Sequence, residues 1–434
     1  MEKEDILKYL KDWNFWSNKI DIGIDREPYL SEISPSIKIK EIIVITGIRR
    51  CGKSTLLLQL LKKSGYPEKN TLIINLEDPR VIGITVNDLM QIYEAYLEEL
   101  KPDKEQLIVL DEIQNVANWE SIARYLYDNK RVNVFVTGSN SGLLSSEFAS
   151  ALSGRHLEYR IMPLSFCEFL KFKNIEFRNK IELLKKETRI KESAEEYCKY
   201  GGFPKVVLTD DENEKRKILA SYYNTILIKD IAIRYKIKET AKLHDLARFY
   251  LTNVSKIISM NKIKNVLGVS LESVQRFSEY LENSYLICFV PKFDYSYNKQ
   301  VVNPKKIYSG DLGIRDIVSF QFSEDEGRLL ENWVFLELKR AGEDVYYYKT
   351  KNGLEVDFAI KGRKNVKQLI QVTKSLKDFN TRERELKALV KALNETNLRE
   401  GLILTKHTEE IISIKGYKII VKPIWKWVLQ RKII

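Results

Sequence analysis

One short stretch combines residue types and spacing that suit the binding of phosphate groups. It reads GIRRCGKST, and Gly47, Gly52, Lys53 and Ser54 occupy the fixed positions of the pattern GxxxxGK[ST]. Glycines let a backbone wrap closely around phosphate oxygens, and the N–H groups of the loop and of the following helix attract negative charge. Lys53 is expected to reach the β- and γ-phosphates of ATP, and Ser54 to bind Mg²⁺. The candidate nucleotide contacts are Gly47, Ile48, Arg49, Arg50, Cys51, Gly52, Lys53, Ser54 and Thr55.

Two acids at the end of a later apolar run could supply the metal ligand and the general base that hydrolysis needs in addition to the phosphate-binding stretch. The run LIVLDE ends in Asp111 and Glu112. Asp111 is expected to hold Mg²⁺ through its water shell, and Glu112 to polarise the attacking water as a general base. A tandem acid with an extra strand before it favours the hydrolytic branch of the phosphate-loop enzymes over kinases and GTPases. No NKxD-type stretch, which a GTPase would need, follows any strand.

Further polar residues are candidates for contacts with the γ-phosphate. Ser139 and Asn140 follow the next apolar run and could touch the γ-phosphate or the lytic water, with Thr137 a weaker candidate. The alternative is a simple turn. Arg155 could serve as an arginine finger, within one chain or from a second copy, or could form a surface salt bridge. The loop chemistry does not require Arg49 and Arg50, which could pair with an acid such as Glu112 or with a lid, or lie at the surface.

The elements that must position these residues alternate along the first third of the chain. Short apolar runs read as strands, and amphipathic or capped stretches between them read as helices. This order predicts a parallel sheet with helices on both faces. The predicted strands are 41–46, 71–76, 106–112, 132–139 and 156–164, and the predicted helices are 55–63, 87–100 and 118–128.

The rest of the chain changes character twice. From 165 to 240 the pattern is helical and irregular. From 243 to 300 it predicts helices and strands with a turn at Leu267-Gly268-Val269, which is typical of a helix-turn-helix with a possible wing. From about 328 the chain returns to alternating helices and strands.

Composition limits the class of protein and the partners. A formal net charge of +12 and a sequence pI near 9.1 suggest an acidic partner such as nucleic acid, or else only a Lys-rich surface. Four scattered cysteines and three scattered histidines argue against a zinc site and for a reducing compartment. No apolar run approaches the roughly 18 residues of a membrane helix, so we expect a soluble, cytoplasmic protein without a membrane partner.

Several stretches together resemble a large family of archaeal and bacterial AAA-type ATPases with a nuclease-like C-terminal half. They are IDREPYL (24–30), GIRRCGKST, LIVLDEIQ (107–114), VTGSNSGLL (136–144), LSGR (152–155), PLSFCEFL (163–170), GGFP (201–204), SGDLGIRD (309–316), LLENWVFLEL (329–338) and EVDFAI (355–360). The resemblance implies an α/β multidomain chain. Its parts are an N-terminal extension (1–40), a P-loop ATPase core of the ASCE class (41–164), a helical lid (165–240), a winged helix (241–300) and a degenerate restriction-endonuclease-like domain (301–434).

The helix-turn-helix is a poor match to a reader of DNA sequence. The helix from Ser270 carries Glu272, Glu279 and Glu282 against one Arg276, and acids repel the phosphate backbone. Nonspecific DNA contact and a protein-packing role both stay open.

The nuclease-like part lacks residues that nucleases of the PD-(D/E)xK type use. Glu331 and Asp357 are present, but Gln371 stands where an acid belongs and Thr373 where the lysine belongs. Lys374 is one position late and would point to the other face of its strand. Losing one carboxylate weakens Mg²⁺ binding, and losing the lysine removes the group that activates water, so we predict an inactive or very weak nuclease.

Two functions follow for the whole chain. The first is Mg²⁺-dependent ATP hydrolysis that switches the attached domains. The second is a slow-turnover, ATP-controlled adaptor for a protein partner or nucleic acid. The oligomeric state is left open by the sequence.

Overall fold

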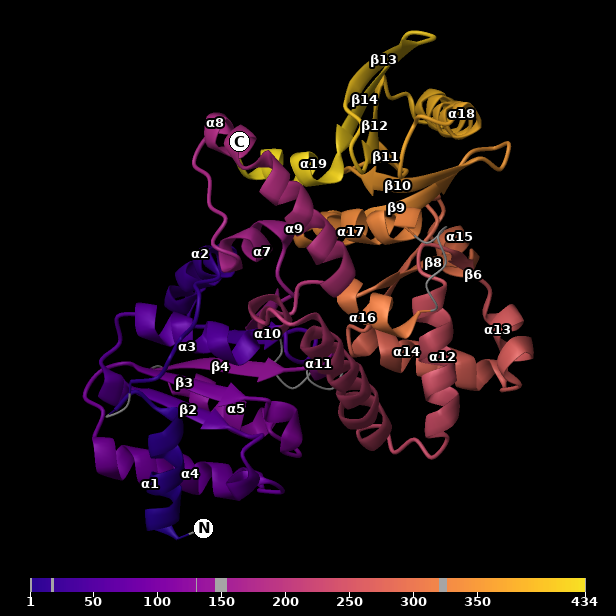
Figure 1. Cartoon of the computed structure of the whole chain (residues 1–434). Coiled ribbons are helices and arrows are strands. Elements are labelled where there is room, and N and C mark those ends of the chain that lie inside the picture. The colour runs from indigo at the N-terminus through magenta and orange to yellow at the C-terminus, as the bar shows by residue number, and fades with distance from the viewer. Residues whose placement is uncertain (1, 17–18, 130, 145–153, 320–325, 434) are drawn as a thin grey trace. The chain divides into compact units, whose positions relative to one another are not determined.

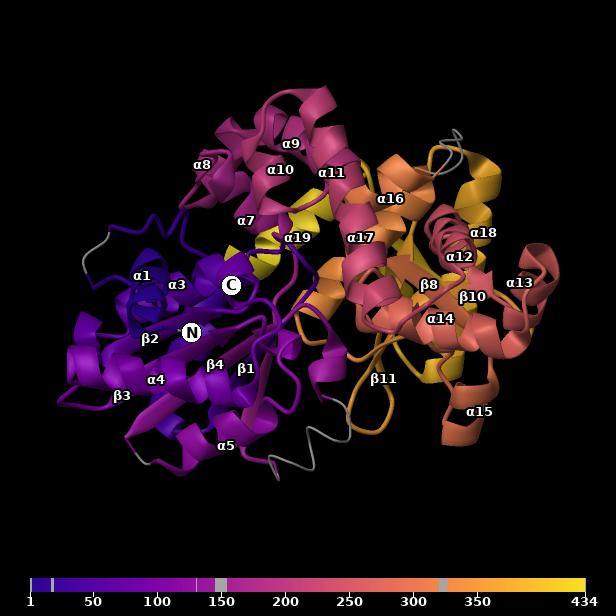
Figure 2. The same ribbon diagram turned by 90° about the horizontal axis from the view of Figure 1, so that it is seen from below.

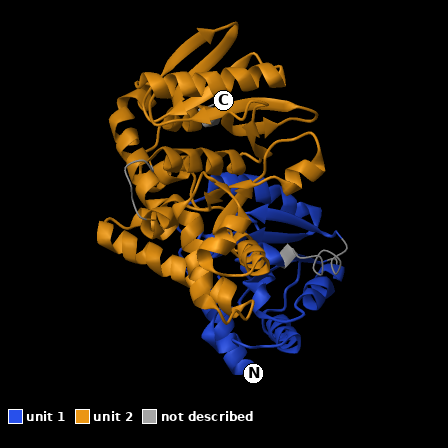
Figure 3. Cartoon of the chain, turned by 90° about the vertical axis from the view of Figure 1, so that its right-hand side faces the viewer, with its two compact units in different colours: residues 1–161 blue, residues 162–434 orange. Residues whose placement is uncertain are grey.

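The computed structural model describes residues 2–16, 19–129, 131–144, 154–319 and 326–433. The chain divides into two compact units, residues 1–161 and 162–434 (Figure 3). No helix within these described ranges is long and apolar enough to cross a membrane.

Unit 1 is built on a five-stranded parallel sheet in the order β2-β3-β4-β1-β5. The strands are β1 (Ile42–Thr46), β2 (Thr71–Asn75), β3 (Gln106–Asp111), β4 (Val132–Gly138) and β5 (His156–Arg160). The strands β1, β3 and β4 are buried along their whole length, as their continuous runs of Val, Ile and Leu predict for a sheet covered on both faces. The expected parallel sheet is therefore confirmed, and β4 lies between β1 and β3.

Helices cover the two faces of this sheet (Figure 1). They are α1 (Lys3–Trp13), α2 (Glu27–Ile33), α3 (Lys53–Lys63), α4 (Val86–Leu100) and α5 (Glu120–Asp128). Apolar side chains of α1, α4 and α5 form one core with the strands, and α2 packs on α3. The helix α4 begins with a capping box, in which Thr85 and Asp88 each bond the other's backbone N–H, and such a box specifies a helix start locally.

Unit 2 begins with a helical segment. Its elements are α7 (Phe166–Phe172), α8 (Lys180–Lys185), α9 (Glu187–Tyr200), α10 (Pro204–Leu208), α11 (Glu212–Thr225) and a π-helical stretch, Ile226–Ile233.

Four helices and a small antiparallel sheet follow in the described residues, and they lie together in both Figure 1 and Figure 2. The elements are α12 (Thr240–Thr252), β6 (Ile257–Ile258), α13 (Met260–Leu267), α14 (Leu271–Asn283), β7 (Ile287–Val290), α15 (Tyr297–Val302) and β8 (Lys305–Ser309). The predicted turn is present: Gly268 takes a left-handed conformation after α13, and the Ser270 side chain caps α14. The sheet order is β6-β8-β7, so the expected boundary at residue 300 falls inside the connection between β7 and β8.

The last part of unit 2 holds a six-stranded mixed sheet in the order β13-β14-β12-β11-β10-β9. The elements are α16 (Leu312–Val318), α17 (Glu326–Arg340), β9 (Val345–Lys349), β10 (Glu355–Lys361), β11 (Val366–Val372), α18 (Phe379–Thr396), β12 (Glu400–Thr405), β13 (Glu410–Ile414), β14 (Tyr417–Pro423) and α19 (Ile424–Ile433). Apolar residues of α18 pack on these strands and form a second core.

Candidate functional site

The phosphate-loop sequence connects β1 to α3, as the motif requires. Gly47 has φ +152°, and a Cβ at this position would lie 2.1 Å from the carbonyl oxygen of Ile161. The Ile161 backbone N–H in turn donates to the Thr46 carbonyl at 2.7 Å. Gly52, with φ +99°, precedes the first residue of α3. Gly47 therefore needs both the positive φ and the absence of a Cβ, whereas Gly52 is favoured by its positive φ.

Lys53 lies buried at the centre of the loop. Its Nζ donates to the Gly47 carbonyl at 3.1 Å and lies 3.3 Å from Oε1 of Glu112. Since only 4% of Lys53 is exposed, its charge acts with little screening by water. The lysine and the predicted general base therefore share one site.

Asp111 ends β3 and lies within hydrogen-bonding reach of Ser54 at the start of α3. The Thr137 hydroxyl on β4 also donates to Oδ1 of Asp111, at 2.5 Å. Burial, with the neighbouring charge of Glu112, raises the pKa of Asp111 to about 6. A hydroxyl beside a carboxylate is an oxygen pair of the kind Mg²⁺ prefers, so Ser54 and Asp111 fit this ion.

Glu112 is held in an unusual conformation. Its φ of +55° is left-handed, and its backbone N–H donates to the Thr137 hydroxyl at 2.9 Å. Gln114 donates to Oε2 of its carboxylate, opposite the contact with Lys53. Burial by itself would raise the pKa of Glu112, but the charges of Lys53 and Arg49 outweigh it and lower that pKa. The carboxylate is therefore charged at neutral pH, as a general base must be.

Thr137 is the residue of β4 that joins the two acids, although the sequence favoured Ser139 and Asn140. Both of those side chains are buried, and Oδ1 of Asn140 accepts from the Gly142 N–H at 2.6 Å. The signal that could have found Thr137 is register, because Leu110 pairs with Val136 and the next residues along both strands are neighbours.

The two arginines of the phosphate loop, Arg49 and Arg50, differ in their exposure to solvent. Arg49 is buried and its Nη1 lies 2.5 Å from Oε1 of Glu77, just after β2. Arg50 is exposed and has φ +69°. A third arginine was missed by the sequence reasoning: Arg26, 2% exposed, donates from Nη1 to the Cys51 carbonyl at 2.9 Å. Arg26 therefore supports the loop from the segment before α2.

Arg155 does not join this site. It precedes β5, so it lies at the amino end of the parallel sheet, whereas the phosphate loop follows β1 at the carboxyl end. Its Nη1 lies 3.6 Å from Oδ1 of Asp128, and its guanidinium covers the Tyr127 ring at 5.5 Å. The length of a five-residue strand, at about 3.3 Å per residue, separates the two ends. This placement does not support a finger that acts within one chain, and the role of Arg155 as a finger stays a prediction.

A second cluster of acids lies in unit 2 around the Lys306 side chain of β8. Lys306 Nζ lies 2.9 Å from Oε1 of Glu331, 2.9 Å from Oδ1 of Asp357 and 2.8 Å from Oε1 of Glu355. The Tyr308 hydroxyl also donates to Oε1 of Glu331, at 2.6 Å. Lys306 is 1% exposed, and burial with the charge of Asp357 raises the pKa of Glu331 to about 8. An ammonium group thus lies between the acids that the sequence analysis assigned to a nuclease-type metal site.

The other predicted positions of that site are also accounted for. Gln371 accepts from the Asp357 N–H at 3.2 Å and donates to Glu385. Thr373 is buried, and Lys374 reaches the surface, where its Nζ lies 2.5 Å from Oε2 of Glu326. No group of three or more His, Cys, Asp or Glu side chains able to hold a metal occurs in the part of the chain that the structure describes.

Comparisons with known protein families match most of the chain in three parts. An AAA domain matches residues 39–170, the domain of unknown function DUF8612 matches 191–325, and the domain of unknown function DUF4143 matches 326–427. The uncharacterized protein MJ1544 of Methanocaldococcus jannaschii is 37% identical over 416 residues, which cover 92% of this chain and 91% of the relative. An uncharacterized protein of Haemophilus influenzae is 31% identical over 416 residues, 94% of this chain and 99% of the relative. The solved Walker-type ATPase paby2304 of Pyrococcus abyssi aligns with 70% of this chain and 99% of its own, with a TM-score of 0.47 and 16% identity.

Proposed function

The chain belongs to the same family as these archaeal and bacterial relatives and carries an AAA domain, and we propose that it is a Mg²⁺-dependent ATPase. One observation carries the proposal. The strand β4, inserted between β1 and β3, brings Thr137 against both Asp111 and Glu112, beside the buried Lys53. A site that only binds a nucleotide has no need of a charged, oriented carboxylate at this position.

Each residue then has a distinct task. The loop N–H groups and the α3 N-terminus hold the phosphates, and Lys53 exchanges its contact with Glu112 for the β- and γ-phosphate oxygens. Ser54 and Asp111 would hold Mg²⁺, which would supply positive charge to neutralise the phosphates. Glu112 accepts a proton from the attacking water, and Gln114 and Thr137 keep its carboxylate and backbone in place.

Glu112→Gln tests the role of the general base. Glutamine keeps the shape of the side chain but cannot accept the proton, so turnover should fall by about 10²–10⁴-fold while ATP still binds. Glu98→Gln, at an exposed ion pair with Lys3, is the matched control and should leave turnover unchanged. Unchanged turnover in Glu112→Gln would remove Glu112 as the base.

The runner-up function is a slow adaptor in which the ATP-bound state is itself the signal. The contact between Lys53 and Glu112 favours slow turnover, because it must break before the lysine can bind phosphate. Wild-type protein that binds ATP tightly but turns it over no faster than Glu112→Gln, with or without DNA, would support the adaptor and contradict the ATPase.

We further propose that hydrolysis switches the parts of unit 2. The order of α12, β6, α13, α14, β7 and β8, with the sheet β6-β8-β7, supports a winged-helix arrangement there. Glu272 and Glu279 are exposed on α14, which argues against sequence reading by this helix and leaves nonspecific DNA or a protein as partner. Binding to duplex DNA that is absent even at low salt would leave only the protein partner.

For the last part of unit 2 we propose an inactive nuclease-like domain. An ammonium 2.8–2.9 Å from three carboxylates already supplies the positive charge that a metal ion would bring. Plasmid cleavage with Mg²⁺ or Mn²⁺ that Asp357→Ala abolishes would contradict this proposal.

A further inference from the structure

Unit 2 contains a cavity of about 410 Å³ between α9 and α17. The lining residues of α9 recur at helical spacing and form one face of that helix, and those of α17 form another. Residues of α16, the start of α19 and the segment after β12 complete the wall. The lining side chains that matter below are Ala194, Glu195, Glu326, Trp333, Lys406 and Trp425. Cavities of 300–1,000 Å³ are typical of sites for small molecules.

The floor of this cavity is apolar and aromatic. Trp333 and Trp425 are 2% and 4% exposed, and Leu329, Leu330 and Ile424 lie with them in the lining. Burial raises the pKa of the Cys198 thiol, also in the wall, to about 12, so it stays neutral. Because so little of either indole is exposed and Trp333 already packs against Phe166 and Tyr197, the floor offers a ligand apolar contact but no open ring face for stacking.

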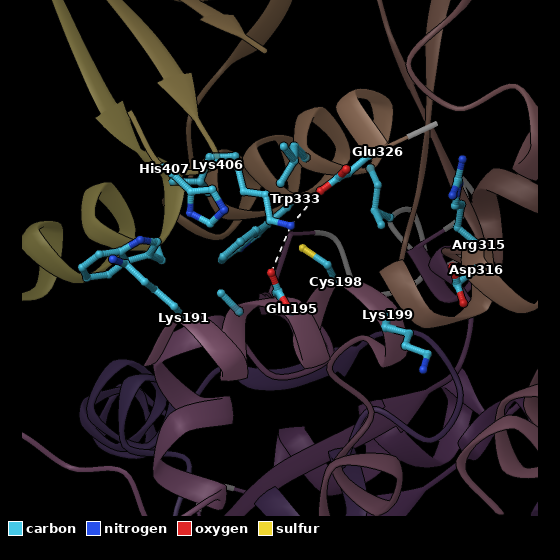
Figure 4. Close-up of a pocket in the computed structure, with 15 residues that line it drawn as sticks. Lys191, Glu195, Cys198, Lys199, Arg315, Asp316, Glu326, Trp333, Lys406 and His407 are labelled. Atoms are coloured by element: carbon cyan, nitrogen blue, oxygen red, sulfur yellow. Dashed lines mark ion pairs between the residues drawn. The ribbon is translucent and has the colours of Figure 1, made fainter. Parts of the chain in front are cut away.

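The rim is charged, and Lys406 is its central member. Figure 4 shows Lys406 between Glu326 and Glu195, with Trp333 alongside. Its Nζ lies 2.8 Å from Oε1 of Glu326 and 3.0 Å from Oε1 of Glu195. An ammonium has three N–H donors, and these two acids occupy two of them. The Glu195 side chain is 61% exposed, so this second contact is screened by water and readily exchanged for another anion.

The balance of charge in the wall is positive. Four cationic side chains (Lys191, Lys199, Arg315 and Lys406) face three acidic ones (Glu195, Asp316 and Glu326), a difference of +1. Lys191 and Lys199 also pair with Glu187 and Glu212 outside the wall, so the preference for an anion rests on Lys406. Desolvation, with the positive charges of Lys406 and Lys191, lowers the pKa of His407 in the same wall. A ligand with an anionic group is therefore favoured at the rim over a cationic one.

We propose that this cavity is a binding site for a small anion that carries an apolar ring. The ring lies on the apolar floor beside Leu329, Leu330 and Ile424, and the anionic group takes the place of Glu195 at Lys406. The site belongs wholly to unit 2, whereas the phosphate loop belongs to unit 1, so the two sites share no residue. A ligand here would contact α9 of the helical segment and α17 and α19 of the nuclease-like part together.

The test uses 8-anilinonaphthalene-1-sulfonate, a planar aromatic sulfonate whose fluorescence rises in apolar surroundings. Wild-type protein should bind one equivalent and show quenched tryptophan emission. Ala194→Trp fills the cavity from α9 and should weaken binding by at least about tenfold, because an overfilled site excludes the ring. Lys406→Met removes the rim cation and should weaken binding by roughly threefold or more.

Lys374→Met is the matched control. Lys374 pairs with the other oxygen of Glu326 but does not line the cavity, so its loss should leave probe binding within about twofold of wild type. Circular dichroism and thermal melting verify that each variant is folded. If Ala194→Trp does not fold, the comparison of Lys406→Met with Lys374→Met decides the question. Equal binding by wild type and Lys406→Met, or equal weakening by both lysine variants, would overturn the proposal.

Discussion

The buried ammonium of Lys306 provides the sharpest test of the energetics of unit 2. We consider Lys306→Met, which keeps the length of the side chain and removes its charge. The acids Glu331, Asp357 and Glu355 would then lie together without a cation, where Lys306 Nζ now lies 2.8–2.9 Å from each. Removing one member of a buried ion cluster costs about 3–5 kcal/mol, because the remaining charge stays buried and uncompensated.

This loss of unfolding free energy can be converted into a shift of the melting temperature. Unit 2 spans residues 162–434, and for chains of this general size each kcal/mol shifts the midpoint by about 2–4 °C. The transition of unit 2 should therefore fall by roughly 6–20 °C in Lys306→Met. Differential scanning calorimetry of wild type and variant measures this shift.

The pH dependence of the unfolding free energy provides an independent test of this cluster. Since burial and Asp357 raise the pKa of Glu331 to about 8, the folded state binds its proton more tightly than the unfolded state does. The unfolding free energy should therefore be highest below about pH 4.5 and fall toward pH 8, by about 1.4 kcal/mol per pH unit if Glu331 alone titrates. Glu331→Gln should remove this slope and cost little at pH 7, where the acid is mostly protonated.

Two controls make the reasoning refutable. Lys374→Met breaks an ion pair whose lysine is 59% exposed and should cost less than about 1 kcal/mol. Asp357→Asn should cost clearly more than Glu331→Gln at pH 7, because it removes a paired charge. If Lys306→Met melts within the range of Lys374→Met, or if Glu331→Gln keeps the full pH slope, the account of this cluster is wrong.

Three further predictions concern unit 1. Gly47→Ala places a Cβ 2.1 Å from the Ile161 carbonyl oxygen, so ATP affinity measured with a fluorescent analogue should fall by at least about 100-fold; near-normal affinity would contradict the backbone argument. Because the pKa of Asp111 is raised to about 6, Mg²⁺-dependent ATP binding should weaken as pH falls below 6, and Asp111→Asn should abolish that dependence in a calorimetric titration. Thr137→Val removes the hydroxyl that joins the two acids. The loss of about 1–3 kcal/mol of hydrogen bonding should lower kcat/KM by roughly 10–100-fold. Unchanged kinetics would show that Thr137 serves only in packing.

Features set by neighbouring residues could be predicted from the sequence. The phosphate loop lies in one contiguous stretch, and its glycines are needed at their own positions, so spacing alone places it between β1 and α3. The parallel sheet follows from buried apolar runs, and the turn before α14 follows from Gly268 and Ser270. In each case the physical constraint acts over a few residues.

Features that depend on register across strands, or on contacts between distant segments, were decided only by the tertiary structure. Thr137 meets Asp111 because β4 pairs with β3 in one particular register, and Arg26 reaches Cys51 from 25 residues away. Arg155 has a plausible local sequence but lies at the wrong end of β5. Lys306 is one lysine among many in a basic chain, and only the pairing of β8 and the packing of α17 and β10 bring it between three acids. The sequence by itself determined which chemistry the loop can perform; the folded chain decided which charges surround that chemistry, because electrostatic interactions depend on distance in space and not on distance along the chain.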